Sequence, residues 1–171
     1  MSGSFVIEAL GAHERSGFSC GAPALDHYLK TQAGQDMKKL VASCFVLVEK
    51  ATDTVAGYYT LSASSIPAKD LPEKTLKRLP RYPILPAALI GRLAVDRRFA
   101  RRGLASAMLA DAALRVMNGD MKAFALIVDA KDENALAFYR LQGFRAFTSR
   151  PMSLFLPLAT LRKAALPETR A

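Results

Sequence analysis

The stretch from residue 89 onward alternates between two kinds of segment, and this alternation constrains the fold more than any other feature of the chain. Leu89–Val95 and Phe124–Val128 are short, mostly apolar runs of strand length. Phe124–Val128 is apolar at every position, as expected of a strand that is covered on both faces. Gly103–Asn118, which lies between them, carries apolar residues at helical spacing. A strand, a helix and a second strand in this order predict a βαβ crossover with parallel strands.

The remainder of the chain adds an antiparallel meander before this crossover and a helix and a strand after it. Five prolines lie within Ser64–Ala87, and this density excludes a long helix or a central strand there, although Glu73–Leu79 has room for one or two helical turns. The elements predict a single mixed α/β domain over residues 1–165 and a disordered tail at 166–171. The further expected strands are Phe5–Leu10, Val41–Glu49, Val55–Ala63 and Ser153–Leu158. The further expected helical segments are Ala22–Lys30, a following stretch to Lys39, Glu133–Leu141 and a short one from Leu161.

Basic residues dominate the charge of the chain. The 171 residues include 24 Lys and Arg against 15 Asp and Glu, which gives a net charge of +9. An excess of this size creates a positive field that attracts polyanions, so nucleic acids, acidic proteins and phosphorylated cofactors are all candidate partners. A basic surface that only keeps the protein soluble is the alternative, and composition does not choose between the two.

Metal-binding residue types are few. Cys20, Cys44, His13 and His27 lack the paired spacing of a zinc site, so we expect no metal. Reduced thiols are the favoured state of the cysteines, with a disulfide between them as the open alternative. The first ten residues show no signal-peptide pattern, and no apolar run approaches the ~20 residues that span a membrane. We therefore expect a cytoplasmic protein without a membrane segment.

The strand-to-helix turn Arg101–Ala105 has the composition of a phosphate site. Amide groups at a helix start lack partners within the helix, and the helix dipole adds partial positive charge there. Gly103 allows a ligand to approach the backbone closely, and the arginines before it attract anions over a longer range. A P-loop and a Rossmann turn are excluded, because Gly103 is the only glycine between Gly91 and Gly119. An ordinary turn with a basic rim is the alternative.

Two motifs of the chain, taken together, resemble those of the GNAT acetyltransferase superfamily. The first is Arg92–Asp96 followed by the Gly103 turn, and the second is the run Asn134–Phe144, which contains Tyr139. They occur in the family's order and are separated by one amphipathic helix. Ala100 departs from the family's pattern, which often has Gln or Arg there. The missing side-chain contact should weaken cofactor binding by ~1 kcal/mol unless a neighbouring arginine replaces it.

This resemblance implies a GNAT fold, in which a central mixed β-sheet is flanked by helices and Leu89–Asp96 splays away from Ala123–Asp129. It also implies that acetyl-CoA is the co-substrate. The pantetheine arm would lie in the gap between those strands, and the pyrophosphate would rest on the amides of the turn. The residues implied to bind acetyl-CoA are Leu93 and Val95 through their backbone, the turn residues Arg101, Arg102, Gly103, Leu104, Ala105 and Ser106, and the side chain of Asn134.

A closer resemblance covers nearly the whole chain and is to the acetyltransferase toxins of bacterial toxin–antitoxin pairs. It is carried by Phe18–Gly21, Gly57–Ser62, Leu79–Pro86, Gly91–Asp96 and Val128–Lys131. It implies acetylation of the α-amine of the amino acid on a charged tRNA, which stops translation. It further implies a ribbon-helix-helix antitoxin as partner and a homodimer.

Basic residues of the proline-rich segment then have a candidate role on tRNA. We expect Lys77, Arg78 and Arg81 to neutralise phosphates of the acceptor stem, since such contacts supply most of the non-specific affinity for nucleic acid. A solvated loop is one alternative for the run Lys74–Arg81. A surface that is covered by an acidic antitoxin tail is another.

Arg92 is a further candidate for substrate binding. It precedes the strand positions at which the resemblance places the pantetheine arm. A structural ion pair with Asp96 or Asp129 is the alternative.

Tyr139 is the candidate catalytic residue. The α-amine of an aminoacyl ester has a pKa near or below the ~7.7–8.0 of a free α-amino group, so much of it is already neutral. A tyrosine hydroxyl, with an ordinary pKa of about 10, is a poor base but a suitable general acid toward the CoA thiolate. A core aromatic with a satisfied hydroxyl is the alternative. Direct transfer is favoured over an acyl-cysteine, because no His–Asp pair is placed to activate either thiol.

Two other functions stay open. One is a GNAT enzyme that acetylates a small-molecule or protein amine; such an enzyme more often has an acidic acceptor cleft, against which the positive charge argues. The other is non-enzymatic, a nucleic-acid-binding co-repressor that acts with an antitoxin.

Overall fold

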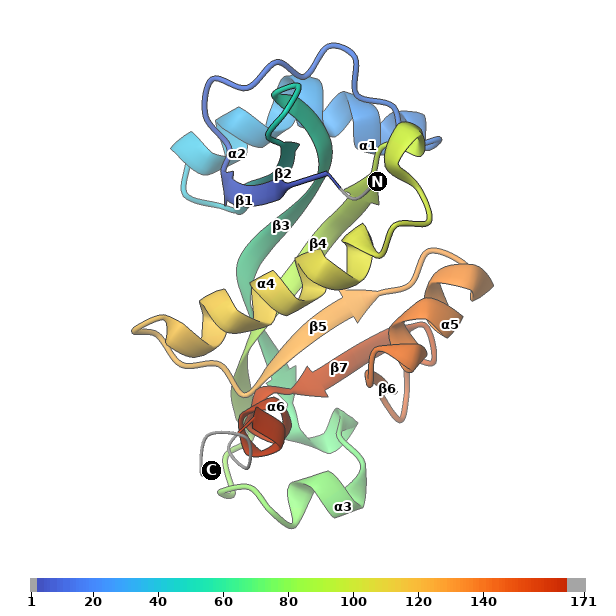
Figure 1. Cartoon of the computed structure of the whole chain (residues 1–171). Coiled ribbons are helices and arrows are strands. Elements are labelled where there is room, and N and C mark those ends of the chain that lie inside the picture. The colour runs from blue at the N-terminus through green and yellow to red at the C-terminus, as the bar shows by residue number, and fades with distance from the viewer. Residues whose placement is uncertain (1–2, 166–171) are drawn as a thin grey trace, which may run out of the picture. The chain divides into compact units, whose positions relative to one another are not determined.

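The strands of the protein, seen here in a computed structural model that describes residues 3–165, form one seven-stranded sheet (Figure 1). Its strand order is β1-β2-β3-β4-β5-β7-β6. The tail predicted at 166–171 lies outside the described residues. The strands are β1 (Phe5–Ala9), β2 (Ser43–Glu49), β3 (Thr54–Pro67), β4 (Ile84–Val95), β5 (Ala125–Asp129), β6 (Arg145–Ala146) and β7 (Ser153–Pro157), and the helices are α1 (Pro23–His27), α2 (Ala33–Lys38), α3 (Glu73–Leu76), α4 (Leu104–Asn118), α5 (Glu133–Leu141) and α6 (Leu158–Ala165).

The chain divides into two compact units. The first comprises Met1–Ser62 and Ile90–Ala112, and the second comprises Ala63–Leu89 and Ala113–Ala171. The strands β3 and β4 pass through both units. The single domain predicted from the sequence stays a prediction.

In the first unit, antiparallel strands carry a core on which the N-terminal helices pack. β1 pairs with β2, with Ile7 opposite Leu47, and β2 pairs with β3. The core cluster joins residues of these strands to the helical segment, and its members Leu29, Val46 and Tyr58 are fully buried. A π-helical turn at Tyr28–Gln32 connects α1 to α2. The helical segments predicted at Ala22–Lys30 and onward to Lys39 are therefore confirmed, apart from this wider turn.

The start of α4 is packed closely on the strands of the same unit. A Cβ atom at Gly57 of β3 would lie 2.9 Å from the carbonyl oxygen of Ala94 and 2.9 Å from the Cε of Met108. Met108 is fully buried. A side chain at position 57 would thus push α4 away from β3 and β4, which explains why this position holds a glycine.

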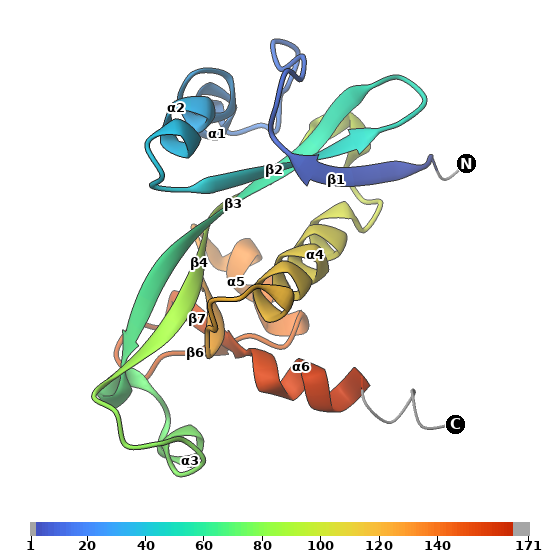
Figure 2. The ribbon, with the colours of Figure 1, turned by 90° about the vertical axis from the view of Figure 1, so that its left-hand side faces the viewer.

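In the second unit, β7 lies between two antiparallel partners. It pairs with β5, with Ile127 opposite Phe155, and with the two-residue strand β6, which the sequence did not predict. Leu85, Phe147 and Phe155 belong to its buried core. Figure 2 shows α3 in the connection between the far ends of β3 and β4, and α6 following the end of β7.

One expectation about the proline-rich segment is wrong. We expected no central strand in Ser64–Ala87, yet β3 continues to Pro67 and β4 begins at Ile84. A proline in a strand lacks the backbone N–H donor but keeps its carbonyl acceptor. The carbonyl of Pro86 accepts a hydrogen bond from the amide of Phe124 at 2.8 Å. Pro67 is the last residue of its strand, where the ladder ends.

The predicted fold class is confirmed. The protein has a mixed α/β architecture with a seven-stranded sheet flanked by helices, and α4 supplies the crossover between the neighbouring strands β4 and β5. Cys20 and Cys44 are both reduced thiols, as expected. The parting of Leu89–Asp96 from Ala123–Asp129 stays a prediction.

Candidate active site

The turn before α4 has the backbone geometry of an anion site. Gly103 has a φ of +74°, and Arg101 has a φ of +63°. The carbonyl of Gly103 accepts the first helical hydrogen bond, from the amide of Ala107 at 3.1 Å. The amides of the three intervening residues, Leu104, Ala105 and Ser106, therefore have no carbonyl to bond within the helix. Three donors at the positive end of a 15-residue helix are suited to a pyrophosphate.

The space in front of this turn is open. A Cβ atom built at Gly103 would meet no other heavy atom of the described residues within 4 Å. The glycine is thus required by its left-handed φ rather than by packing, and a ligand can reach the backbone. This combination of free donors and open space fits the pyrophosphate that the sequence assigned to the turn.

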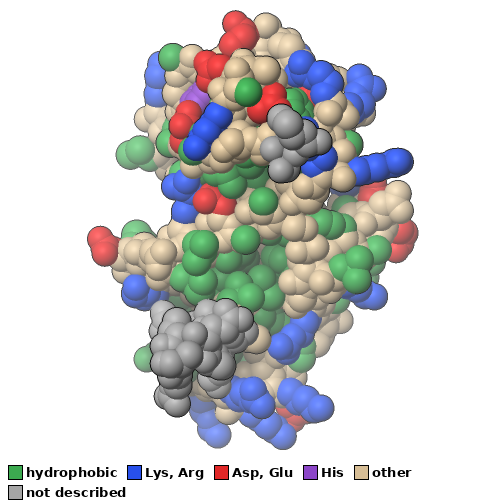
Figure 3. All heavy atoms as spheres, in the orientation of Figure 1, with side chains coloured by type: hydrophobic (Ala, Val, Ile, Leu, Met, Phe, Trp, Pro, Cys, Tyr) green, Lys and Arg blue, Asp and Glu red, His purple; other side chains and the backbone are tan. Residues whose placement is uncertain are grey.

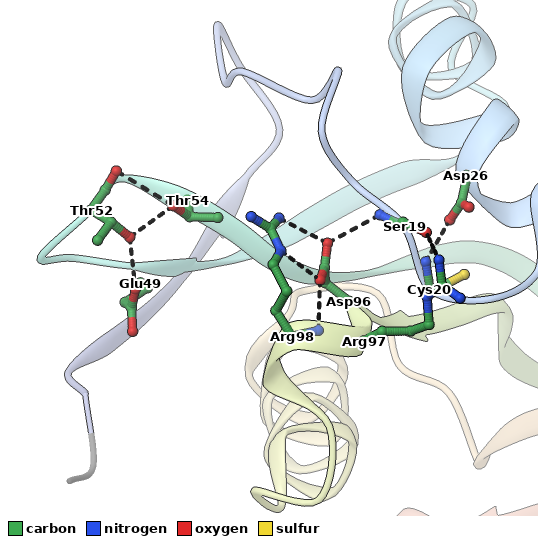
Figure 4. A network of polar contacts seen from close by, with 9 residues as sticks. All are labelled: Ser19, Cys20, Asp26, Glu49, Thr52, Thr54, Asp96, Arg97 and Arg98. Atoms are coloured by element: carbon green, nitrogen blue, oxygen red, sulfur yellow. Dashed lines mark hydrogen bonds and ion pairs between the residues drawn. The ribbon is translucent and has the colours of Figure 1, made fainter.

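A buried carboxylate holds the chain that leads into the turn (Figure 4). Asp96, at the end of β4, is 1% exposed and has four hydrogen bonds. Its Oδ1 accepts from the amide and the Nε of Arg98, both at 2.9 Å, and its Oδ2 accepts from the amide of Ser19 and the Nη2 of Arg98, both at 3.0 Å. Burial raises the pKa of Asp96, but the hydrogen bonds from Arg98 and Ser19 outweigh it and hold the pKa below its ordinary value.

This network accounts for two of the four arginines near the turn. Arg97 donates from its amide to the Ser19 carbonyl and from Nη2 to the Ser19 hydroxyl, each at 2.9 Å. Arg98 is engaged with Asp96 and is not free to replace the contact that Ala100 lacks. Local sequence patterns do not predict this pairing, because Ser19 and Asp96 are 77 residues apart.

The other two arginines remain available. Within residues 3–165, neither Arg101 nor Arg102 forms an ion pair. The guanidinium of Arg102 lies 5.2 Å from the ring centroid of Phe5 and 5.6 Å from that of Phe99. Arg101 is exposed. These two cations can therefore attract a phosphate to the turn.

The strand positions predicted to bond the pantetheine arm lie in the last part of β4. Leu93 and Val95 are half-buried, and Ala94 between them is buried. In the sheet, β4 has β3 and β5 as its neighbours. Binding of the pantetheine arm along the backbone of Leu93 and Val95 stays a prediction.

Arg92, the residue before these positions, does not pair with Asp96, whose carboxylate is bonded to Arg98, so the Asp96 part of that alternative is wrong. Its guanidinium carbon lies 3.5 Å from the ring centroid of Tyr28, a cation–π contact. The Tyr28 hydroxyl donates to Asp36 at 2.8 Å, and burial together with this bond raises the pKa of Tyr28 to about 12. Arg92 is therefore held against an aromatic face, with its donors still able to bind an anion.

Tyr139 lies on α5 in the second unit. Asp132 caps this helix by accepting from the amide of Ala135 at 2.8 Å, and Asn134 is exposed on the first turn. The Tyr139 ring is 8% exposed and packs edge-on against Phe144, with centroids 5.5 Å apart. The helix has the bounds predicted from the sequence, Glu133–Leu141.

The hydroxyl of Tyr139 has no hydrogen-bond partner among residues 3–165. The alternative of a core aromatic with a satisfied hydroxyl is therefore not what the structure shows. Burial and the nearby carboxylate of Asp129 raise its pKa to about 12. A hydroxyl with this pKa stays protonated at neutral pH, which suits a general acid and excludes a role as general base.

The basic residues of the proline-rich segment separate into two groups. Arg78 lines a cavity in the second unit together with Lys74 and Arg145. Lys77 and Arg81 are exposed and do not line it. Sequence reasoning did not place Arg145 here, because it lies far along the chain from the segment around Arg78.

Most of the sequence matches a known family. A sequence model of the Acetyltransferase (GNAT) family matches residues 11–144. The chain belongs to the GNAT acetyltransferase family. It is therefore an enzyme that transfers an acetyl group from acetyl-CoA to an amine, as the resemblance of its motifs implied.

Two proteins of related sequence extend along nearly all of this acetyltransferase. A probable toxin TacT of Sinorhizobium fredii is 30% identical over 168 residues, which are 92% of this chain and 93% of that toxin. A tRNA-acetylating toxin of Mycobacterium tuberculosis is 33% identical over 153 residues, which are 88% and 90% of the two chains.

Several solved structures are also similar to this acetyltransferase. The toxin AtaT in complex with acetyl-methionyl-tRNAfMet has a TM-score of 0.87 at 28% identity, over 94% of this acetyltransferase and 99% of that chain. A tyrosine-to-phenylalanine mutant of KacT has a TM-score of 0.86 at 27% identity, over 94% and 98%. AtaTR with bound acetyl-CoA has a TM-score of 0.78 at 27% identity, over 94% and 97%.

Residues 3–165 contain no group of three or more His, Cys, Asp or Glu side chains arranged to hold a metal ion. No helix in the same part of the chain is long and apolar enough to cross a membrane.

Proposed function

We propose that this acetyltransferase is a toxin that acetylates the α-amine of aminoacyl-tRNA and so blocks translation. The observation that carries the proposal is its similarity to a tRNA-acetylating toxin, at 33% identity over 88% of the chain, and to AtaT in complex with acetyl-methionyl-tRNAfMet, at a TM-score of 0.87 over 94%. The net charge of +9 supports a nucleic-acid substrate over a small cationic amine, because a positive surface repels such amines.

Acetyl-CoA, when bound, supplies the thioester that carries the acetyl group. The amides of Leu104, Ala105 and Ser106 would hold its pyrophosphate, with Gly103 allowing close approach and Arg101 and Arg102 adding positive charge. The free amide donors and the open space in front of Gly103 support this assignment. The backbone of Leu93 and Val95 and the side chain of Asn134 would bond the pantetheine arm.

The acceptor amine needs no strong base, because an aminoacyl ester's α-amine is largely neutral near pH 8. The step that needs a proton donor is protonation of the CoA thiolate as it leaves. Tyr139 would donate it from its hydroxyl oxygen, acting as general acid. A hydroxyl without a partner on a largely buried tyrosine, whose pKa is raised to about 12, supports this role, because it carries its proton at neutral pH and gives up no existing hydrogen bond to donate it.

Transfer would be direct, without an acetylated enzyme. Cys44 is buried, and burial raises the pKa of its thiol to about 12. A thiol of this kind is almost entirely protonated at neutral pH and is a poor nucleophile.

The proposed partners follow from the same relatives. AtaT has been solved with its antitoxin AtaR on DNA, at 25% identity to this chain. We therefore propose an antitoxin partner of the ribbon-helix-helix type, a homodimeric toxin and a cytoplasmic site of action. A toxin–antitoxin complex on DNA would also give the chain a part in repression, beside its enzymatic activity.

The deciding experiment incubates the enzyme with labelled acetyl-CoA and total charged tRNA, followed by release and identification of the acetylated amino acids. We expect label on the α-amine of one or a few amino acids and none on uncharged tRNA. Polyamines and an acetylatable peptide serve as competing acceptors. Label on these acceptors alone would contradict the proposal and favour an enzyme for small-molecule or protein amines.

A further inference from the structure

The second unit contains a basic cavity that acetyl transfer does not use. Its volume is about 450 Å³, and it is lined by side chains from α3, from β6 and from the start of α6. Figure 3 shows Lys and Arg side chains gathered at the end of the molecule that carries α3. A cavity of this volume holds a small ligand or one nucleotide.

Three of the lining side chains are cations without a partner. Lys74, Arg78 and Arg145 form no side-chain hydrogen bond or ion pair within residues 3–165. No Asp or Glu lines the cavity. Asp70, a carboxylate of the same unit, is 3.8 Å from Arg150, and Glu73 on α3 is exposed outside the cavity. Three like charges held together without a counterion favour a ligand that carries more than one negative charge.

Neutral hydrogen-bond donors are also available in the cavity. The Thr75 hydroxyl is buried and has no hydrogen-bond partner among the described residues, and Thr75 lines the cavity. Ala159 and Thr160, in the first turn of α6, line it as well, and their amides precede the helical hydrogen-bond ladder. A buried polar group without a partner needs an explanation, and a bound anion supplies one.

The remaining walls are apolar. Leu79, Phe124 and Pro157 contribute carbon surface beside the cations. A phosphate attached to a ribose and a base would use both kinds of surface, with its charge at the cations and its rings on the apolar wall. An inorganic anion would leave the apolar wall uncovered.

We propose that this cavity binds the 5′-terminal phosphate of the RNA substrate, together with its nucleotide. The identity of the ligand as RNA rests on the proposed function. A phosphate monoester carries about −1.5 to −2 charges at pH 7, against one charge on each internal phosphodiester, and so matches three unpaired cations better. In a charged tRNA, the 5′ phosphate belongs to the same acceptor end as the aminoacylated 3′ terminus. The cavity would therefore select the end of the RNA on which the enzyme acts.

The test measures binding and needs no acetyl transfer. An acceptor-stem RNA hairpin without an amino acid is made with a 5′ phosphate or a 5′ hydroxyl, and its Kd is measured by fluorescence anisotropy. For the native protein we expect the 5′ phosphate to tighten binding about tenfold, as for the gain of a charge-assisted contact. For Arg145→Gln and, separately, Arg78→Gln, the preference should fall below twofold. Arg140→Gln is the matched control, because Arg140 is exposed on α5 and lies outside the cavity.

Equal binding of the two RNA forms by the native protein would overturn the proposal. The same phosphate chemistry occurs in the 3′ phosphate of CoA, so acetyl-CoA and acetyl-dephospho-CoA are compared in parallel. A preference for acetyl-CoA that Arg145→Gln removes would assign the cavity to the cofactor instead. Tight, Arg145-dependent binding of an acidic peptide, with no difference between the RNA forms, would assign it to a protein partner.

The two proposals fail separately. If charged tRNA is not acetylated but the 5′ phosphate preference is found and depends on Arg145, the proposed function is wrong. The assignment of the cavity to a 5′ phosphate is then still supported. If charged tRNA is acetylated and the preference is absent, the cavity assignment alone is wrong. Melting temperatures of the variants show that each one is folded.

Discussion

Asp96→Asn perturbs the network that holds the chain before the Gly103 turn. The native carboxylate accepts four hydrogen bonds, two on each oxygen, from Arg98 and Ser19. Asparagine has nearly the same shape, but one of its two polar atoms is an NH₂ group. Whichever way the amide turns, two of the four donors then face another donor, so two hydrogen bonds are lost.

The expected loss of stability follows from these contacts. A hydrogen bond to a charged group contributes about 1.5–3 kcal/mol, so two lost bonds correspond to roughly 3–6 kcal/mol at most. The side chain of Arg98 is 59% exposed and regains water when its partner is lost, which reduces the cost. We expect the free energy of unfolding to fall by about 2–3 kcal/mol. The Kd for acetyl-CoA should rise several-fold, because the turn that offers the amides is less well held.

Urea unfolding monitored by circular dichroism measures the first effect, and titration calorimetry with acetyl-CoA measures the second. Asp53→Asn is the matched control: Asp53 is exposed and has a φ of +54°, a conformation that asparagine adopts readily. An unfolding midpoint for Asp96→Asn that equals that of the control would refute the reasoning.

Acid supplies a second measurement of the same network. Because the pKa of Asp96 is lower in the folded protein than the ~3.9 of an unfolded aspartate, its contribution is complete above that pH and is lost as the pH falls through the folded value. Below about pH 4, the stability of the native protein should therefore fall more steeply than that of Asp96→Asn. Parallel curves of stability against pH for the native protein and Asp96→Asn would contradict the lowered pKa of Asp96.

Four further substitutions or measurements address the other parts of the site. Tyr139→Phe should lower kcat ~10²-fold and leave the Kd for acetyl-CoA unchanged. Its thermal stability should equal that of the native protein, because the Tyr139 hydroxyl has no hydrogen-bond partner to lose. An unchanged kcat would exclude Tyr139 from the mechanism. Gly103→Ala should cost about 1–2 kcal/mol of stability through its φ of +74° and should raise the KM for acetyl-CoA; a stability and KM equal to the native values would show that the turn does not need glycine. Peptide mass spectrometry after iodoacetamide at pH 8 should find Cys44 unmodified, because burial raises its pKa to about 12, and an acetylated cysteine trapped during turnover would contradict direct transfer. Lys77→Gln with Arg81→Gln should reduce the slope of log K against log salt for tRNA by roughly 1.4–1.8, and an unchanged slope would place the RNA elsewhere.

Local patterns predicted the elements that local chemistry determines. The bounds of α5 follow from apolar residues at helical spacing and from Gly143, whose φ of +100° ends the helix, and both were evident from the sequence. The turn at Gly103 was equally predictable, because a glycine between a predicted strand and a predicted amphipathic helix indicates a tight turn. The family motifs then assigned a ligand to this turn, which composition alone did not.

Long-range contacts account for what the sequence did not show. Proline density suggested an irregular segment, yet Pro86 lies within β4, because its carbonyl serves the ladder and only its missing donor is a cost. The basic cavity is another case, since Arg145 and Lys74 are brought together by the pairing of β6 with β7 and the position of α3. No local pattern carries that information.

The basic residues near the turn show why net charge is an incomplete guide to binding. Arg97 and Arg98 add to the positive field, but one guanidinium donor of Arg97 is bonded to Ser19 and two of Arg98 are bonded to Asp96, so both side chains are held by partners within the fold. Arg101 and Arg102, in the same run, are left for the ligand. The difference is set by one buried carboxylate, which needs its charge balanced, and by a segment of chain 77 residues away. The paired carboxylate of Asp96 thus holds Arg98 in place, whereas Arg101 and Arg102 form no ion pair within residues 3–165 and remain available at the phosphate-binding turn.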